Sequence, residues 1–255
     1  MRHSFSLRGY LSATATAVAL ALSVSTMCLL AQAPAQTWVF VTYTHVKPDM
    51  LHEWLDLQKN EVVPALKKAD VRSRTVWQTA LFGDVYEYVS VTPIEKFAQF
   101  DNPNPIARSL SPQAAARLQE KLRKCITGTH NYATLTLSDL SIPRDSKEPP
   151  KMATFSRVRV APGKVQDYQN FIKTEILPVY KGKVDGYGVS RRIFGGNLSE
   201  FTTVTYYNKF ADLDGGPLLT RLAGQEAAAK IQAKGVGLST PVQSVVRRYV
   251  ADLSF

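Results

Sequence analysis

The chain has 255 residues and a formal net charge of +10, and 45% of its residues are hydrophobic. Its two cysteines are Cys28 and Cys125. If an N-terminal leader that contains Cys28 is removed, one cysteine remains and no disulfide can form within the rest of the chain. A chain of this length can bury a stable hydrophobic core without disulfide bonds. We expect Cys125 to be a small buried residue on a helix.

Residues 1–35 are predicted to be an export signal peptide. Arg2 and Arg8 form a positively charged start, residues 11–31 are uncharged and mostly apolar, and Ala35 ends the favoured cleavage site. Removing this segment, which holds two basic and no acidic residues, lowers the net charge to +8. An uncleaved membrane anchor is the alternative, because about 20 apolar residues can span a bilayer. We expect a periplasmic or secreted protein that contacts a membrane only through an uncleaved signal segment.

The remainder of the sequence is a long internal repeat. Four residues recur 114 positions later: Pro48, Trp54, Glu61 and Pro64 become Pro162, Tyr168, Glu175 and Pro178. The offset is then 113, as from Glu87 to Glu200 and from 139–141 to 252–254, which both read Asp-Leu-Ser. Solenoid and propeller repeats have periods of about 20 to 50 residues, so this repeat indicates a duplicated domain. The halves are 38–142 and 152–255, and the linker 143–151 is polar and rich in proline.

Each half is predicted to have the element order β-α-β-β-α-β. In the first half, strands are expected at 38–46, 72–82, 85–91 and 130–140, with a tight hairpin at Gly83-Asp84. A helix from Pro48 to Lys68 should kink at Pro64. A short helix is expected at 93–100, and a further helix should follow Ser111 to about Lys124. In the second half the strands are expected at 152–160, 187–194, 198–207 and 241–252, and the helices at 162–181 and 217–234.

This order is the ferredoxin-like arrangement, in which helices cover one face of a four-stranded antiparallel sheet. The fold class is therefore α+β, and the second copy is the natural cover for the open sheet face, giving a barrel within one chain. Residues 38–255 resemble the dimeric α/β-barrel superfamily, which includes antibiotic-biosynthesis-type monooxygenases and NIPSNAP-like proteins, as a tandem duplication. The resemblance implies a small-molecule pocket between sheet and helices, or oxygenase chemistry without a metal. It carries no signature motif, so no catalytic residue is transferred.

We expect no cofactor. Haem-binding relatives of this barrel use a histidine in the second half, and residues 152–255 contain none. A histidine-ligated haem in the second half is therefore excluded.

The first strand separates into two faces. Trp38, Phe40, Thr42, Thr44 and Val46 are expected under the helices, whereas Val39, Val41, Tyr43 and His45 are expected to point into the barrel. The second copy carries Arg157 and Arg159 at the positions of Tyr43 and His45. Buried charge needs partners, and Glu87 and Glu200 are the candidates. We predict Tyr43, Trp77, Arg157 and Arg159 as ligand-binding residues.

The expected strand order 4-1-3-2 brings His45 near Glu87 and His130. Two histidines and a carboxylate are ligand types of a divalent metal site, and a His–Glu pair also suits general base catalysis. These three residues are the catalytic candidates and, although a metal is not expected, the metal candidates as well. The alternative is that both histidines are structural residues that hydrogen-bond across strands.

Three functions stay open: an exported barrel that binds a small anionic or aromatic ligand, a monooxygenase-type enzyme that is cofactor-independent or uses a small metal site, and a purely structural protein. A pocket above about 300 Å³ with ionisable groups would favour the first two. The basic pairs Lys67-Lys68, Arg191-Arg192 and Arg247-Arg248 are expected on solvated faces. Their scatter argues against a nucleic-acid partner, and the sequence predicts no oligomeric state.

Overall fold

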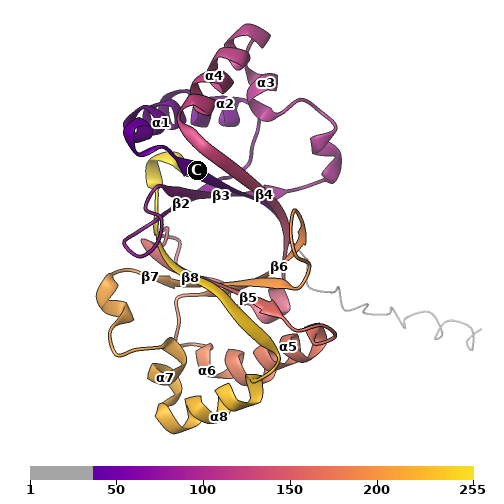
Figure 1. Cartoon of the computed structure of the whole chain (residues 1–255), viewed down its shortest axis with the longest axis vertical. Helices are drawn as coiled ribbons and strands as arrows, with labels where there is room; N and C mark the ends of the chain where they lie inside the picture. Colours follow the sequence, from indigo (N-terminus) through magenta and orange to yellow (C-terminus); the bar gives the residue numbers. More distant parts are fainter. Residues whose placement is uncertain (1–36) are drawn as a thin grey trace, which may run out of the picture. The chain divides into compact units, whose positions relative to one another are not determined.

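The computed structural model describes residues 37–255, and the predicted signal peptide lies outside these residues. Eight antiparallel strands close into a barrel in the order β1-β3-β2-β8-β5-β7-β6-β4, with helices packed outside it (Figure 1). The strands are β1 (Thr37–Val46), β2 (Thr75–Thr79), β3 (Glu87–Ile94), β4 (Ile126–Thr136), β5 (Met152–Val160), β6 (Tyr187–Phe194), β7 (Glu200–Tyr207) and β8 (Ser239–Tyr249). None of the helices in 37–255 is long and apolar enough to cross a membrane.

The strand order follows the sequence prediction in each part of the chain. Strands β1 to β4 lie in the order β4-β1-β3-β2, and strands β5 to β8 lie in the order β8-β5-β7-β6. Two antiparallel seams join these sheets. At one seam β2 pairs with β8, and at the other β4 pairs with β6. Side chains from both sheets therefore face a common interior.

The first helix of each sheet contains a π-helical turn just before its proline. The segments are α1 (Leu51–Leu57), η2 (Gln58–Val62) and α2 (Val63–Lys68), and their counterparts are α5 (Val165–Phe171), η5 (Ile172–Ile176) and α6 (Leu177–Tyr180). Pro64 and Pro178 are the second residues of α2 and α6. Proline has no N–H and crowds the carbonyl four residues earlier. A π-turn, which bonds five residues apart, accommodates both effects, so the kink expected at Pro64 takes this form.

The later helices are η3 (Phe97–Phe100), α3 (Pro105–Ser109), α4 (Pro112–Lys124), η6 (Phe210–Leu213), α7 (Leu218–Ala223) and α8 (Gln225–Gly235). Among the later helices, α3 and α4 begin at side-chain N-caps. The Ser111 hydroxyl accepts a hydrogen bond from the Ala114 N–H at 3.3 Å, as expected of an N-cap. The helix expected at 93–100 is reduced to η3, because Pro93 belongs to strand β3.

The predicted tight hairpin at Gly83-Asp84 is wrong. Strand β2 ends at Thr79 and β3 begins at Glu87, so a longer loop connects them. The Asp84 carboxylate accepts from the Tyr86 N–H at 2.9 Å, and the Gln78 amide donates to the Val85 carbonyl at 3.0 Å. These side-chain bonds replace strand pairing, which explains why the strand expected over 72–82 is shorter.

A hydrophobic core lies between each sheet and its helices. Trp54 is 3% exposed and packs on Tyr88 with ring centroids 4.5 Å apart. Its counterpart Tyr168 is 6% exposed and packs on Phe201 at 5.1 Å. Cys125 is buried beside Trp54 in the first core, as predicted for a small apolar residue.

Two short tails, each containing an Asp-Leu-Ser copy, cross the seams and complete the opposite cores. We call residues 137–141 and 250–254 the crossing tails; they contain η4 (Ser138–Leu140) and η7 (Ala251–Leu253). Leu140 is buried in the core with Tyr168, and Leu253 in the core with Trp54. The Ser141 hydroxyl accepts from the Val189 N–H, and the Ser254 hydroxyl accepts from the Val76 N–H, both at 2.9 Å. Each core thus depends on a tail from the other sheet.

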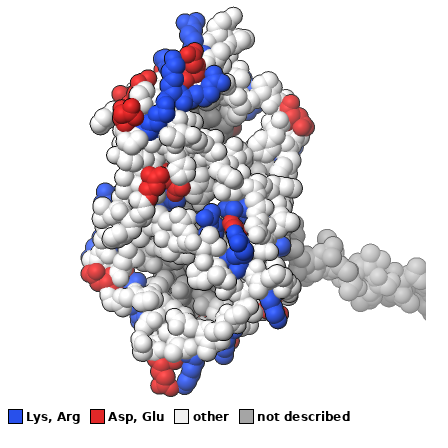
Figure 2. Space-filling model, viewed as in Figure 1, with Lys and Arg blue, Asp and Glu red and all other residues white. Residues whose placement is uncertain are grey.

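The charges on the face shown in Figure 2 are interspersed, with lysine and arginine beside aspartate and glutamate and no single basic stripe. Exposed ion pairs such as Lys121–Glu61, at 3.1 Å, belong to this pattern. Pairs of this kind contribute little to stability.

Candidate functional site

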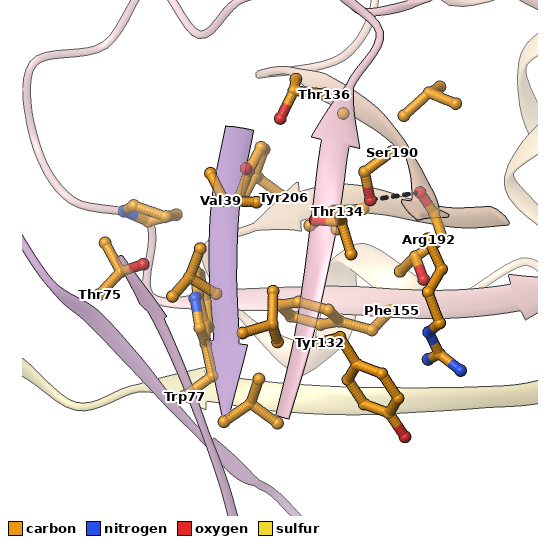
Figure 3. Close-up of a pocket in the computed structure, with 18 of the residues that line it drawn as sticks. Val39, Thr75, Trp77, Tyr132, Thr134, Thr136, Phe155, Ser190, Arg192 and Tyr206 are labelled. Atoms are coloured by element: carbon orange, nitrogen blue, oxygen red, sulfur yellow. Dashed lines mark hydrogen bonds between the residues drawn. The ribbon is translucent and has the colours of Figure 1, made fainter. Parts of the chain in front are cut away.

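The barrel interior contains a cavity of about 320 Å³. Strand β1 alternates as predicted: Val39, Val41 and Tyr43 line this cavity, whereas Phe40, Thr42 and Thr44 line a hollow under the helices. The cavity is lined by Val39, Val41, Tyr43, Thr75, Trp77, Val89, Val91, Tyr132, Thr134, Thr136, Arg144, Pro150, Phe155, Gly188, Val189, Ser190, Arg192, Thr202, Val204, Tyr206 and Tyr249 (Figure 3).

Aromatic side chains supply much of the cavity wall. Trp77 lies at the centre of this group, with its ring 5.4 Å from Phe155, 5.6 Å from Tyr249 and 6.2 Å from Tyr206. Trp77 is 5% exposed. The predicted linker contributes Arg144, which lies over the Tyr206 ring at 5.3 Å and is held by Asp185 at 2.7 Å. The cavity is therefore suited to an apolar or aromatic molecule.

A charged layer lies inside the barrel at the end opposite the linker. Its main acceptor is the buried Glu200 carboxylate on β7. This carboxylate lies 2.5 Å from Arg192 and 3.1 Å from Arg159, and the Nε of Arg157 is 3.9 Å away. Three guanidinium groups thus share one carboxylate.

The equivalent carboxylate, Glu87, is balanced differently. It accepts a hydrogen bond from Arg247, which is 1% exposed and also donates to the Thr79 hydroxyl at 2.8 Å. The Nε2 atom of His45 lies 3.5 Å from Glu87. Strand β1 thus supplies a histidine where β5 supplies Arg159.

The structure brings together two of the three predicted catalytic candidates. His45 lies beside Glu87, and its Nδ1 is 2.9 Å from Asp84 in the β2–β3 loop. His130 is exposed and bonds to the Gly195 carbonyl at 3.1 Å, with its ring against Tyr132. Residues 37–255 contain no group of three His, Cys, Asp or Glu side chains that could hold a metal.

The predicted ligand-binding residues fall into two sets. Tyr43 and Trp77 line the cavity, whereas Arg157 and Arg159 belong to the charged layer around Glu200. Burial raises the pKa of Tyr43, and Arg247, Arg157 and Arg192 oppose that rise. Tyr43 is therefore a neutral phenol at physiological pH, with a hydroxyl that can donate.

The sequence prediction missed Arg192 and Arg247. Both were expected on solvated faces, but they are 8% and 1% exposed. Strand alternation is the reason, because Arg191 and Arg248 take the outward positions of each pair. At the sequence offset of 113 residues, Arg192 corresponds to Thr79 and Arg247 to Thr134. In the structure Thr79 pairs with Arg247 and Thr134 with Arg192, across the two seams.

Two further hollows lie between the sheets and their helices, where the family resemblance implied a pocket. The first, of about 850 Å³, includes Trp54, Arg74 and Arg108 in its lining. The second, of about 490 Å³, includes Tyr168 and Arg221. Burial lowers the pKa of Arg74 to about 10, and the Gln58 side chain accepts from it at 3.0 Å.

Comparison with solved structures identifies the fold. A proposed monooxygenase from Fusobacterium nucleatum superposes with a TM-score of 0.57 at 8% identity, covering 85% of this chain and 93% of its own. An anthrone oxidase-like protein gives 0.55 at 11% identity, covering 86% and 93%. The chain has the dimeric α/β-barrel fold.

A proposed chlorite dismutase shares this barrel, with a TM-score of 0.52 at 10% identity and coverage of 86% and 97%. Identities this low show the fold alone, because one fold hosts many functions. Comparisons with protein-family models and with curated protein sequences find no match. The function of this barrel must therefore be argued from its own residues.

Proposed function

We propose that this protein binds a small organic molecule in the interior of the barrel. The observation that carries the proposal is the cavity of about 320 Å³ between the two sheets. Its volume is at the lower end of the roughly 300–1,000 Å³ that ligand pockets occupy. Aromatic walls around Trp77 and a few polar groups, Arg192 and Tyr43 among them, match the composition of such pockets. A purely structural barrel would fill this space with side chains.

Two further parts of the proposal concern the chain as a whole. We infer that it consists of two ferredoxin-like halves, 38–142 and 152–255, because the π-turns, the Asp-Leu-Ser tails and the strand order all recur. We also propose that residues 1–35 direct export to the periplasm or beyond, on the charge and apolarity of that segment. The ligand would then be met outside the cytoplasm.

A monooxygenase-type enzyme is the second candidate, and the similarity to proposed monooxygenases favours it at the level of the fold. Oxidation without a cofactor requires a base that takes a proton from the substrate. The residues that line the cavity include no histidine, aspartate or glutamate. His45 and Glu87 lie in the charged layer instead. Binding therefore fits this cavity better than catalysis, and a haem held by histidine does not fit it.

Native mass spectrometry of the protein isolated from the cells that produce it tests the proposal. We expect a small organic molecule to be retained at one per chain. Gly188 lines the cavity, and a methyl group added there would meet only Val204 at 3.8 Å. Gly188→Ala should therefore reduce the retained ligand slightly and Gly188→Val should abolish it, while circular dichroism shows both variants to be folded.

Retention that is unchanged in folded Gly188→Val would place the ligand elsewhere and refute the proposal. Oxygen consumption distinguishes the second candidate. If the isolated ligand is consumed together with oxygen when returned to the protein, and Gly188→Val stops this reaction, the barrel is an oxygenase. If the ligand is returned intact, it is a binding protein.

A further inference from the structure

The two seams of the barrel carry the same pair of residues with the strands exchanged. At the β2–β8 seam, Thr79 faces Arg247; at the β4–β6 seam, Thr134 faces Arg192. Both arginines and both threonines are buried. Each seam therefore carries one buried Thr–Arg pair, and the hydrogen-bond partners of the two pairs can be compared directly.

The two residues of the β2–β8 pair bond to each other, and Arg247 also bonds to Glu87. The Nη1 of Arg247 donates to the Thr79 hydroxyl at 2.8 Å, and its Nη2 donates to Glu87. Its Nε has no partner, but Arg247 lies over the rings of Tyr43 and Phe155, at 5.5 and 5.6 Å, and neither it nor Thr79 lines the cavity.

The β4–β6 pair lies in the cavity wall and has polar atoms without partners. The Thr134 hydroxyl and the Nε of Arg192 are buried and have no hydrogen-bond partner. Both residues are 8% exposed, and both line the cavity. Arg192 is held from other directions, by Glu200 at 2.5 Å and by the Tyr132 ring 3.5 Å from its guanidinium carbon. Buried donors without partners are costly, so an acceptor that reached this pair would stabilise it.

The charge around this pair is also unbalanced. Arg192, Arg157 and Arg159 surround Glu200, which gives three positive charges to one negative charge. The Nε of Arg157 is also buried without a hydrogen bond. At Glu87, by contrast, one arginine and one histidine face one carboxylate. Arg159 is exposed, so the poorly solvated excess is that of Arg192 and Arg157 over Glu200. Such an excess favours an anion.

We propose that the ligand of the cavity is a carboxylic acid with an apolar or aromatic body, whose carboxylate accepts hydrogen bonds from Arg192 Nε and the Thr134 hydroxyl. This inference rests on the proposed function. The body of the ligand lies against Trp77 and Phe155. Arg192 binds Glu200 through Nη1, so its Nε remains for a planar acceptor with two oxygens. A phosphate, which carries more charge and more acceptors, would need more donors than this pair provides.

The experiment compares acids with their neutral amides. Phenylacetate, benzoate and hexanoate and the three corresponding amides are titrated against the full chain. Binding is followed by isothermal titration calorimetry and by tryptophan fluorescence, to which Trp77 in the cavity wall contributes. We expect at least one acid to bind about 10- to 100-fold more tightly than its amide, as is usual for hydrogen bonds to a charged group. Inorganic phosphate should not compete.

Thr134→Val and Thr79→Val are the matched variants. Thr134→Val should remove most of the preference for acid over amide and should leave the melting temperature unchanged or higher, because it deletes an unpartnered hydroxyl. Thr79→Val removes a partner of Arg247, so it should lower the melting temperature and leave the preference unchanged. The same loss of preference in both variants would indicate a general effect on the barrel and would overturn the inference.

The possible failures are distinguishable. Equal binding of acid and amide to the unmodified protein overturns the carboxylate assignment and leaves the proposed function intact. Binding of inorganic phosphate that depends on Thr134 overturns it as well, in favour of a phosphorylated ligand. If no compound binds and native mass spectrometry finds no retained molecule, the proposed function fails and the inference fails with it.

Discussion

Replacing Trp54 or Tyr168 by alanine tests whether the two cores are equivalent and coupled. Each ring is buried at the same place on its helix, and each packs on one aromatic residue of the sheet, Tyr88 or Phe201. Removing a buried aromatic ring costs about 3–5 kcal/mol, because contacts are lost and a cavity is left. We therefore expect each variant to lower the free energy of unfolding by an amount in this range.

Urea unfolding followed by circular dichroism and by the fluorescence of the remaining tryptophans provides the measurement. Because each crossing tail is buried in the opposite core, we expect a single transition with an unchanged slope in both variants. Phe82→Ala is the control, since this ring is 67% exposed and its loss should change stability by less than about 0.5 kcal/mol. Losses below about 1 kcal/mol for both Trp54→Ala and Tyr168→Ala, or two separate transitions, would refute this reasoning.

Three further predictions use the same unfolding assay. Glu200→Gln should cost about 3–5 kcal/mol, because buried Arg192 loses its counter-ion; Glu226→Gln, in an exposed pair, should cost under about 1 kcal/mol. Burial raises the pKa of Tyr168 to about 12, whereas the unfolded chain ionises this tyrosine near pH 10. Its contribution to the free energy of unfolding is therefore complete below pH 10 and is lost as the pH rises to 12. The contribution of Tyr168 to this loss is about 1.4 kcal/mol at pH 11, so Tyr168→Phe should lose about that much less stability than the unmodified protein as the pH rises to 11. Leu253→Ala should cost about 2–5 kcal/mol and alter the fluorescence of Trp54, and an unchanged emission spectrum would show that this tail is not part of the first core.

Much of the fold could be predicted from the repeat and from alternation along the strands. The order 4-1-3-2, the inward position of Tyr43 and the burial of Trp54 and Tyr168 all follow from patterns within one copy of the repeat. The β2–β3 loop could not be predicted in this way. Its shape depends on the Asp84 side chain, which bonds to the backbone and ends the strand pairing early.

The candidate site was harder to predict because it depends on contacts between the two sheets. The pairing of Thr134 with Arg192 exists only at a seam, and the sequence of either half does not state which strand edges meet. The pattern Arg-Arg also conceals which arginine points inward, since a shift of one residue exchanges the two faces. The prediction of His45 beside Glu87 succeeded because both residues lie on neighbouring strands of one sheet.

The crossing tails impose an order on how the chain can acquire its structure during synthesis. The Ser254 hydroxyl completes the edge of β2 by accepting from Val76, 178 residues earlier in the chain. Residues 37–136 are therefore synthesised long before their core can be completed. The edge of β2 and the first core remain uncovered until β8 and its tail have been made. Contacts so distant in sequence slow folding. They also leave residues 37–136 without a finished core until residues 250–254 have been made.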